Sequence, residues 1–238
     1  MRRSREDVTL SRMAIFFKLA LWVHIAAGAV ALATFWIPLV VKKGGKLHRF
    51  VGWVYVGAAS VIAFTALIGC ARILTDERPR NDRAGVYLAY VALLAASNAL
   101  IGVRAQRAKA RTAPSRNRLD IGASALLLLS GLAIAVWGIW IAMPLYIAFG
   151  ALGVLLGSGQ LRFWLRAPRD RTEWLRAHMA GMGTSCIATV TAFLVINARH
   201  FGLGTFNVFV WVTPAVLGGV GLSIWTRRIA ASSRMQRS

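Results

Sequence analysis

The chain has 238 residues, 57% of them hydrophobic, and its 29 Lys and Arg residues face 8 Asp and Glu residues. The apolar residues are gathered into seven stretches of roughly 18 or more, which a soluble domain with a packed core would not carry. The net charge of +21 is spread over nearly all connecting segments instead of forming one patch. This distribution predicts contact with the anionic headgroups of a lipid bilayer and excludes a nucleic-acid-binding protein.

The first predicted span covers residues 19–41, which are apolar apart from His24 and Thr34. A bilayer core about 30 Å thick requires about 20 helical residues, and only a helix satisfies its own backbone groups there. Residues 1–12 form a short charged tail before this span. No small-residue cleavage site precedes Lys42, so we interpret the stretch as an uncleaved span and not as a signal peptide.

Six further spans are predicted, at residues 50–71, 85–103, 121–143, 144–161, 179–198 and 208–225. Asp120 is placed as the N-cap of the fourth span, and Pro144 marks the tight turn into the fifth. Gly153 and Gly157 form a GxxxG pair, which is typical of close helix contacts. We expect a single all-α domain over residues 1–238, a bundle of seven transmembrane helices.

Two segments beside these spans carry their own expectations. Asp170 and Glu173 are spaced like a capping box, so the sixth span is expected to begin there as an interfacial helix. The basic residues after Trp225 are expected to form a mobile tail.

The orientation follows from the positive-inside rule. The first, third and fifth connections and the C-terminal tail together hold roughly twice as many Lys and Arg residues as the opposite side. We therefore expect a multi-pass protein of a bacterial plasma membrane with its N-terminus outside and its C-terminus in the cytoplasm. The two flanks of the first span carry equal numbers of basic residues, so the later segments decide this orientation.

The absence of acidic residues from the predicted spans, and of known catalytic motifs from the chain, limits the functions that the sequence indicates. No acidic residue lies within any predicted span, which argues against a proton-coupled pump. The chain has no Gly-rich phosphate loop, HExxH, CxxC or GxSxG motif, so neither zinc nor nucleophilic catalysis is indicated.

The four histidines are the candidate functional residues. On the predicted topology, His24 and His200 lie toward the outer face, while His48 and His178 lie at the inner ends of the second and sixth spans. Two neutral histidines facing each other across a helix cleft are the ligands of haem b, so an inner and an outer haem site are expected. The alternative is that these histidines are interfacial residues that meet phosphate headgroups.

A stripe of small and polar residues accompanies the inner histidines. Gly52 and Tyr55 follow His48 on one side of the second span, and Met182 and Ser185 follow His178 on the sixth. These residues suit a ligand groove. Alternatively, the hydroxyl groups bond to carbonyls of their own helix and pack on neighbouring helices.

Two stretches resemble a known family. Residues 43–56, KGGKLHRFVGWVYV, are similar to the K-G-x-x-H-R-x-x-G-x-x-Y pattern of bacterial multi-pass membrane proteins of unknown function, with one additional residue between Gly44 and His48. The stretch HMAGM at residues 178–182 is similar to that family's H-x-x-x-M segment. This resemblance implies an inner site formed by His48, Gly52, Tyr55, His178 and Met182. The paired histidines also give a looser likeness to cytochrome b561-type membrane cytochromes.

The leading functional expectation is therefore a haem-b-type redox protein of the membrane. Its partner would be either a quinone or a second redox protein. If this protein is an enzyme, it is a membrane oxidoreductase. Two alternatives stay open, a non-redox carrier of small molecules or lipids and a structural partner in membrane assembly.

Overall fold

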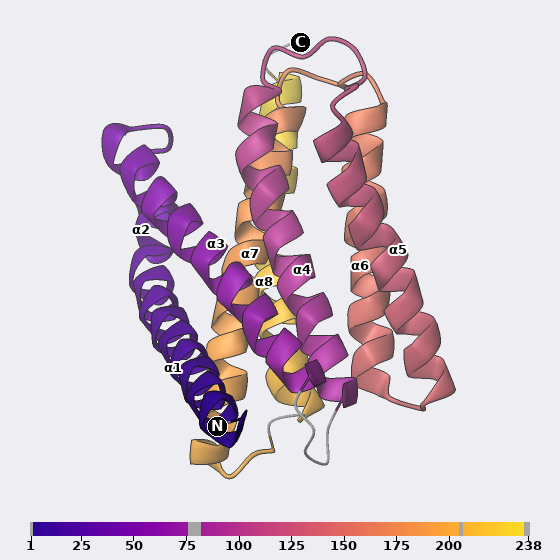
Figure 1. The fold of residues 1–238 in the computed structure, drawn as a ribbon. Helices are drawn as coiled ribbons and strands as arrows, with labels where there is room; N and C mark the ends of the chain where they lie inside the picture. The colour runs from indigo at the N-terminus through magenta and orange to yellow at the C-terminus, as the bar shows by residue number, and fades with distance from the viewer. Residues whose placement is uncertain (1, 76–81, 205–206, 236–238) are drawn as a thin grey trace. The chain divides into compact units, whose positions relative to one another are not determined.

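In a computed structural model of the chain, residues 2–75, 82–204 and 207–235 are described, and no strand occurs among them. Within these ranges seven helices are long and apolar enough to cross a membrane, which confirms the predicted all-α class and its seven spans (Figure 1). The elements are α1 (Arg2–Thr34), α2 (Trp36–Val40), α3 (Lys46–Thr75), α4 (Asp82–Arg107), α5 (Arg118–Trp140), α6 (Pro144–Leu165), α7 (Glu173–Asn197), η1 (Ala198–Phe201) and α8 (Val208–Met235).

The helices at both ends are longer than the apolar stretches alone predict. The N-terminal segment that we expected to be a tail is helical from Arg2, and the expected mobile tail is helical as far as Met235. Neither segment contains Gly or Pro, so nothing in the local sequence stops a helix that the neighbouring span has already begun.

The first span is not one continuous helix, contrary to expectation. The helix α1 ends at Thr34, and the short helix α2 follows after Phe35. Pro38 explains this break, because a proline lacks the N–H that would bond to the carbonyl four residues earlier, and its ring clashes with that carbonyl. The carbonyl in question belongs to Thr34, the last residue of α1.

The chain divides into two compact units, Met1–Ala92 and Leu93–Ser238, and the boundary falls within α4. In the first unit α1 packs against α3. Ala31 of α1 and Tyr55 of α3 are among the most deeply buried residues of this unit.

In the second unit α5 and α6 form a tight helical hairpin (Figure 1). A Cβ atom added to Gly157 of α6 would lie 2.6 Å from the backbone nitrogen of Leu128 in α5, so the two backbones are in contact there. This contact confirms the helix-contact role predicted for Gly157, and Gly153 of the same pair is buried.

The turn between α5 and α6 is a Schellman motif. Ala142 N–H donates to Ile139 O at 3.2 Å, and Met143 N–H donates to Gly138 O at 2.8 Å. Ala142 has φ of 53°, a left-handed conformation in which glycine is the usual residue. Pro144 then occupies the start of α6, as predicted.

Two of the predicted helix caps are wrong. Asn117, not Asp120, caps α5, since its side-chain oxygen accepts hydrogen bonds from the N–H groups of Leu119 and Asp120. The side chain of Asp120 is instead directed away from the helix end toward α4.

The N-cap of α7 is Thr172, and the helix begins at Glu173. Asp170 lies outside it and accepts hydrogen bonds from the backbone N–H and the hydroxyl of Thr172, at 2.8 and 2.7 Å. Because Arg176 also donates to this carboxylate, Asp170 is held in the preceding loop and the predicted capping box does not form.

Candidate functional site

His48 lies in the first turn of α3 and takes part in closing the first helical connection. Its Nδ1 is 3.2 Å from the carbonyl oxygen of Pro38. Lys43 donates from Nζ to the same carbonyl at 2.8 Å and also to Leu39 O. Gly44 makes the turn with φ of 73°. These bonds satisfy carbonyls at the end of α2 that have no partner within that helix, so the Lys-Gly-…-His stretch has a structural role here.

His178 lies one turn inside α7 and is tied to α4. Its Nδ1 is 2.6 Å from the carbonyl oxygen of Gly102. The exposed side chain of Gln106 covers the same ring, with its Nε2 atom 3.0 Å from Nδ1 and 3.4 Å from Nε2 of His178. The ring orientation is therefore fixed mainly by a backbone carbonyl of the neighbouring helix.

His24 lies in the middle of α1 and bonds across to α3. Its Nδ1 is 2.8 Å from the hydroxyl of Thr65. That hydroxyl lies 2.7 Å from Val61 O, to which it donates its single hydrogen. His24 therefore bridges the two helices within the first unit.

The hydrogen bonds of His48 and His178 to backbone carbonyls assign one tautomer to both rings. A carbonyl oxygen only accepts, so the Nδ1 atoms of His48 and His178 must carry the proton. In each ring Nε2 is then the basic nitrogen, which is the atom that binds a metal when Nδ1–H is held by a second group.

The histidines of each unit lie at different depths. In the first unit His24 is level with Thr65, which is seventeen residues, or roughly 25 Å, beyond His48 along α3. In the second unit His178 and the exposed His200 of η1 lie near opposite ends of one span. Neither unit alone brings two histidines to one level. The pairing of His48 with His178, and of His24 with His200, stays a prediction.

The residues of the predicted ligand groove are largely packed. Tyr55 is 1% exposed, whereas Gly52 is partly accessible. On α7, Ser185 is buried, and the backbone and sulfur of Met182 lie against Gly102 of α4. This part of the α7 face therefore contacts another helix.

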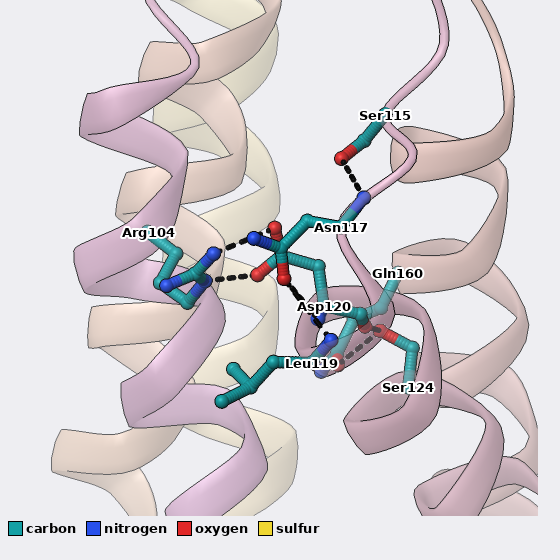
Figure 2. Close-up of polar contacts among 7 residues, drawn as sticks. All are labelled: Arg104, Ser115, Asn117, Leu119, Asp120, Ser124 and Gln160. Atoms are coloured by element: carbon teal, nitrogen blue, oxygen red, sulfur yellow. Dashed lines mark hydrogen bonds and ion pairs between the residues drawn. The ribbon is translucent and has the colours of Figure 1, made fainter.

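The spans also contain a charged pair that the sequence analysis did not identify. Asp120, 5% exposed, lies in the first turn of α5 and inside the fourth candidate span. Arg104 of α4 donates to both oxygens of this carboxylate, through Nε and, at 3.0 Å, through Nη2 (Figure 2). The predicted fourth span, 121–143, contains no acidic residue, but α5 begins three residues earlier and so includes Asp120. The first turns of α4 and α7 also contain one acid each, Asp82 and Glu173.

Three more polar side chains extend this pair, two of them in the helical hairpin and the third on α4. Ser124 donates to Asp120 O at 2.7 Å and lies 3.4 Å from Gln160 Oε1 (Figure 2). Gln160 Nε2 lies 3.4 Å from Asn98 Oδ1 of α4. We call Asn98, Arg104, Asp120, Ser124 and Gln160 the polar cluster. The sequence could have indicated this cluster through Asn98 and Gln160, since polar residues within a span usually have a partner.

The connection between α4 and α5 positions Asp120. Arg111 donates to the carbonyl oxygens of Phe163 at 2.6 Å, Trp164 at 3.1 Å and Arg166 at 2.7 Å, which lie at the end of α6. Its guanidinium also lies 4.7 Å from the centre of the Phe163 ring. Burial lowers the pKa of Arg111 from its usual value. This anchor fixes the segment from which α5 begins.

Comparisons with known proteins give no further guidance. No family model, no curated protein and no solved structure matches the chain. The resemblances drawn from the two histidine-containing stretches stay predictions. Within the ranges that the structure describes, no group of three or more His, Cys, Asp and Glu residues is arranged to hold a metal ion. A haem site differs from such a group, because the macrocycle supplies four ligands and the protein only one or two.

Proposed function

We propose that this protein binds haem b in the membrane and transfers electrons, with Nε2 of His48 and of His178 as axial ligands. The supporting observation is the hydrogen bond from each Nδ1–H to a backbone carbonyl, at 3.2 Å to Pro38 O and 2.6 Å to Gly102 O. Bound haem would supply a one-electron couple, and either a quinone or a second redox protein would exchange electrons with it. His24 and His200 are weaker candidates for an outer site.

The tautomer and the rigidity of the two rings support this proposal. An iron ligand must present a neutral imidazole with a fixed orientation, and a carbonyl on Nδ1 provides both. The rings lie near the ends of their helices, close to the membrane faces where an electron partner has access. The same bonds would stabilise the two helix ends in a protein without haem, so haem content must be measured.

The proposed setting is a bacterial plasma membrane, with the N-terminus outside and the C-terminus in the cytoplasm. This orientation places His48, His178 and the basic segment around Arg111 on the cytoplasmic side. The density of Lys and Arg residues in the connections on that side supports it, because cytoplasmic loops are enriched in basic residues.

The experiment is a haem determination on the purified full-length chain and its variants. His48→Ala and His178→Ala are each expected to abolish haem binding at the inner site. Loss of all haem in both single variants indicates one haem with two ligands, while loss of about half in each indicates two haems. Gln106→Ala is the matched control, since Gln106 touches the His178 ring but is exposed and is not a proposed ligand. This control is expected to retain haem.

Two outcomes would contradict the proposal. If both histidine variants bind as much haem as the wild type, these residues are not the ligands. If the wild type from haem-replete cells contains no haem, the redox function is wrong, and the non-redox carrier becomes the leading alternative.

A further inference from the structure

The polar cluster leaves one of its side chains poorly bonded. Gln160 is 6% exposed, and a buried amide ordinarily uses most of its two donor and two acceptor positions. Its two contacts, to Asn98 and to Ser124, are both 3.4 Å long. Good hydrogen bonds to oxygen are shorter, about 2.7–3.2 Å. The Ser124 hydroxyl, moreover, directs its hydrogen at Asp120 O, only 2.7 Å away.

The carboxylate of Asp120 also has unused acceptor capacity. A carboxylate offers about four lone-pair positions. Arg104 uses one position on each oxygen, and no other side chain of the cluster donates to them (Figure 2). A buried charge is costly unless its remaining lone pairs are also satisfied. The cluster therefore contains a carboxylate and an amide that both have capacity for another hydrogen bond.

A small cavity lies where these groups meet. Its volume is about 10 Å³, counted as the space open to the centre of a water molecule. A single water requires roughly 10–15 Å³ on this measure, together with two to four polar partners. The polar side chains that line the cavity come from three helices, and the apolar ones close it. The lining residues are Ser97, Leu100, Ile101, Asp120, Ala123, Ser124, Gln160 and Trp164.

We propose that this cavity is a binding site for one internal water molecule. The water donates one hydrogen to the Asp120 carboxylate and the other to Gln160 Oε1, and it accepts from the hydroxyl of Ser97. It thus joins α4, α5 and α6 through a polar centre inside an otherwise apolar part of the second unit. The cavity is too small for any ligand larger than water, and the site is independent of the proposed haem.

The test is a density map at about 2 Å of the full-length chain in lipid nanodiscs. The expected result is a solvent peak within about 2.6–3.2 Å of an Asp120 oxygen and of the Gln160 amide. A cavity without a peak, with the Gln160 amide moved to about 2.9 Å from Asn98 and Ser124, would overturn the proposal. The wild-type map alone decides between these results.

A variant gives a second measurement. Gln160→Met keeps the length of the side chain and removes the amide, and we expect it to lose the peak and to lower the melting temperature by about 2–6 °C. If the cavity is dry, the same change removes a poorly bonded amide, and the melting temperature stays the same or rises. Ser158→Ala is the matched control on α6, because Ser158 is partly exposed, does not line the cavity and donates to Leu155 O of its own helix. This control is expected to keep the peak.

Discussion

Replacement of Asp120 by Asn tests how strongly the buried charged pair holds the second unit together. The change keeps the shape of the side chain but removes the charge that accepts two hydrogen bonds from Arg104. A hydrogen bond to a charged group contributes about 1.5–3 kcal/mol net, and a negative charge in the first turn of a helix adds about 0.3–1 kcal/mol. Asn retains one acceptor, and the Arg104 side chain, 18% exposed, has partial access to the surroundings. We therefore expect the free energy of unfolding to fall by about 2–3 kcal/mol, near the lower limit for breaking a buried pair.

The assay is reversible unfolding by SDS in mixed micelles, followed by tryptophan fluorescence, on Asp120→Asn, Arg104→Gln and the double variant. Groups in direct contact couple by about 0.5–3 kcal/mol, and we expect at least 1 kcal/mol here because the pair is bidentate. Asp170→Asn is the control, since it breaks a more exposed pair with Arg176 in the loop before α7. An effect below about 1 kcal/mol is expected there. Additivity of the two cluster variants within about 0.5 kcal/mol would refute the role assigned to the pair.

Three further predictions concern the second unit. Ala142→Gly is expected to stabilise the protein by about 0.5–1 kcal/mol, because glycine adopts the left-handed conformation of this turn without the Cβ clash; a lower melting temperature would contradict this. Gly157→Val is expected to destabilise the hairpin by more than about 3 kcal/mol, since its side chain would overlap the backbone of α5 at Leu128; thermal unfolding at wild-type level would show that the backbones are not in contact. Arg176 lowers the pKa of Asp170 well below its usual value, so the pair stabilises the fold above about pH 4, and this contribution is lost as the pH falls further. The difference in melting temperature between wild type and Asp170→Asn should accordingly be full at pH 6 and shrink steadily as the pH falls below about 4, because it vanishes only below the lowered pKa of Asp170. A difference that stays constant as the pH falls would exclude the pair as the cause.

The fold was predictable because a bilayer imposes a simple rule on the sequence. Long apolar stretches identify the spans, and Pro144 and Gly157 mark a helix start and a helix contact through properties of the single residue. Pro38 also marks a helix boundary through a property of the single residue. It lies within a continuous apolar stretch, however, where composition alone indicates one unbroken helix.

The candidate site was predictable only in part, because it depends on contacts between residues far apart in the sequence. The polarity of His24, His48 and His178 identified them as unusual, but their carbonyl and hydroxyl partners follow from helix packing. Asp120 was expected to cap its own helix because the sequence does not distinguish an acid at the N-cap from an acid at the third position of the helix. Its actual partner, Arg104, belongs to the preceding helix.

The visible absorption spectrum of the purified wild-type protein tests the central claim most directly. The protein would be prepared in detergent from haem-replete cells and measured as isolated and after reduction with dithionite. The account predicts a Soret band together with α and β bands that sharpen on reduction, as expected for a haem iron with two histidine ligands. A colourless protein under these conditions would contradict the proposed function. His48 and His178 would then be residues that close helix ends, and the Asp120 pair would become the first place to look for function.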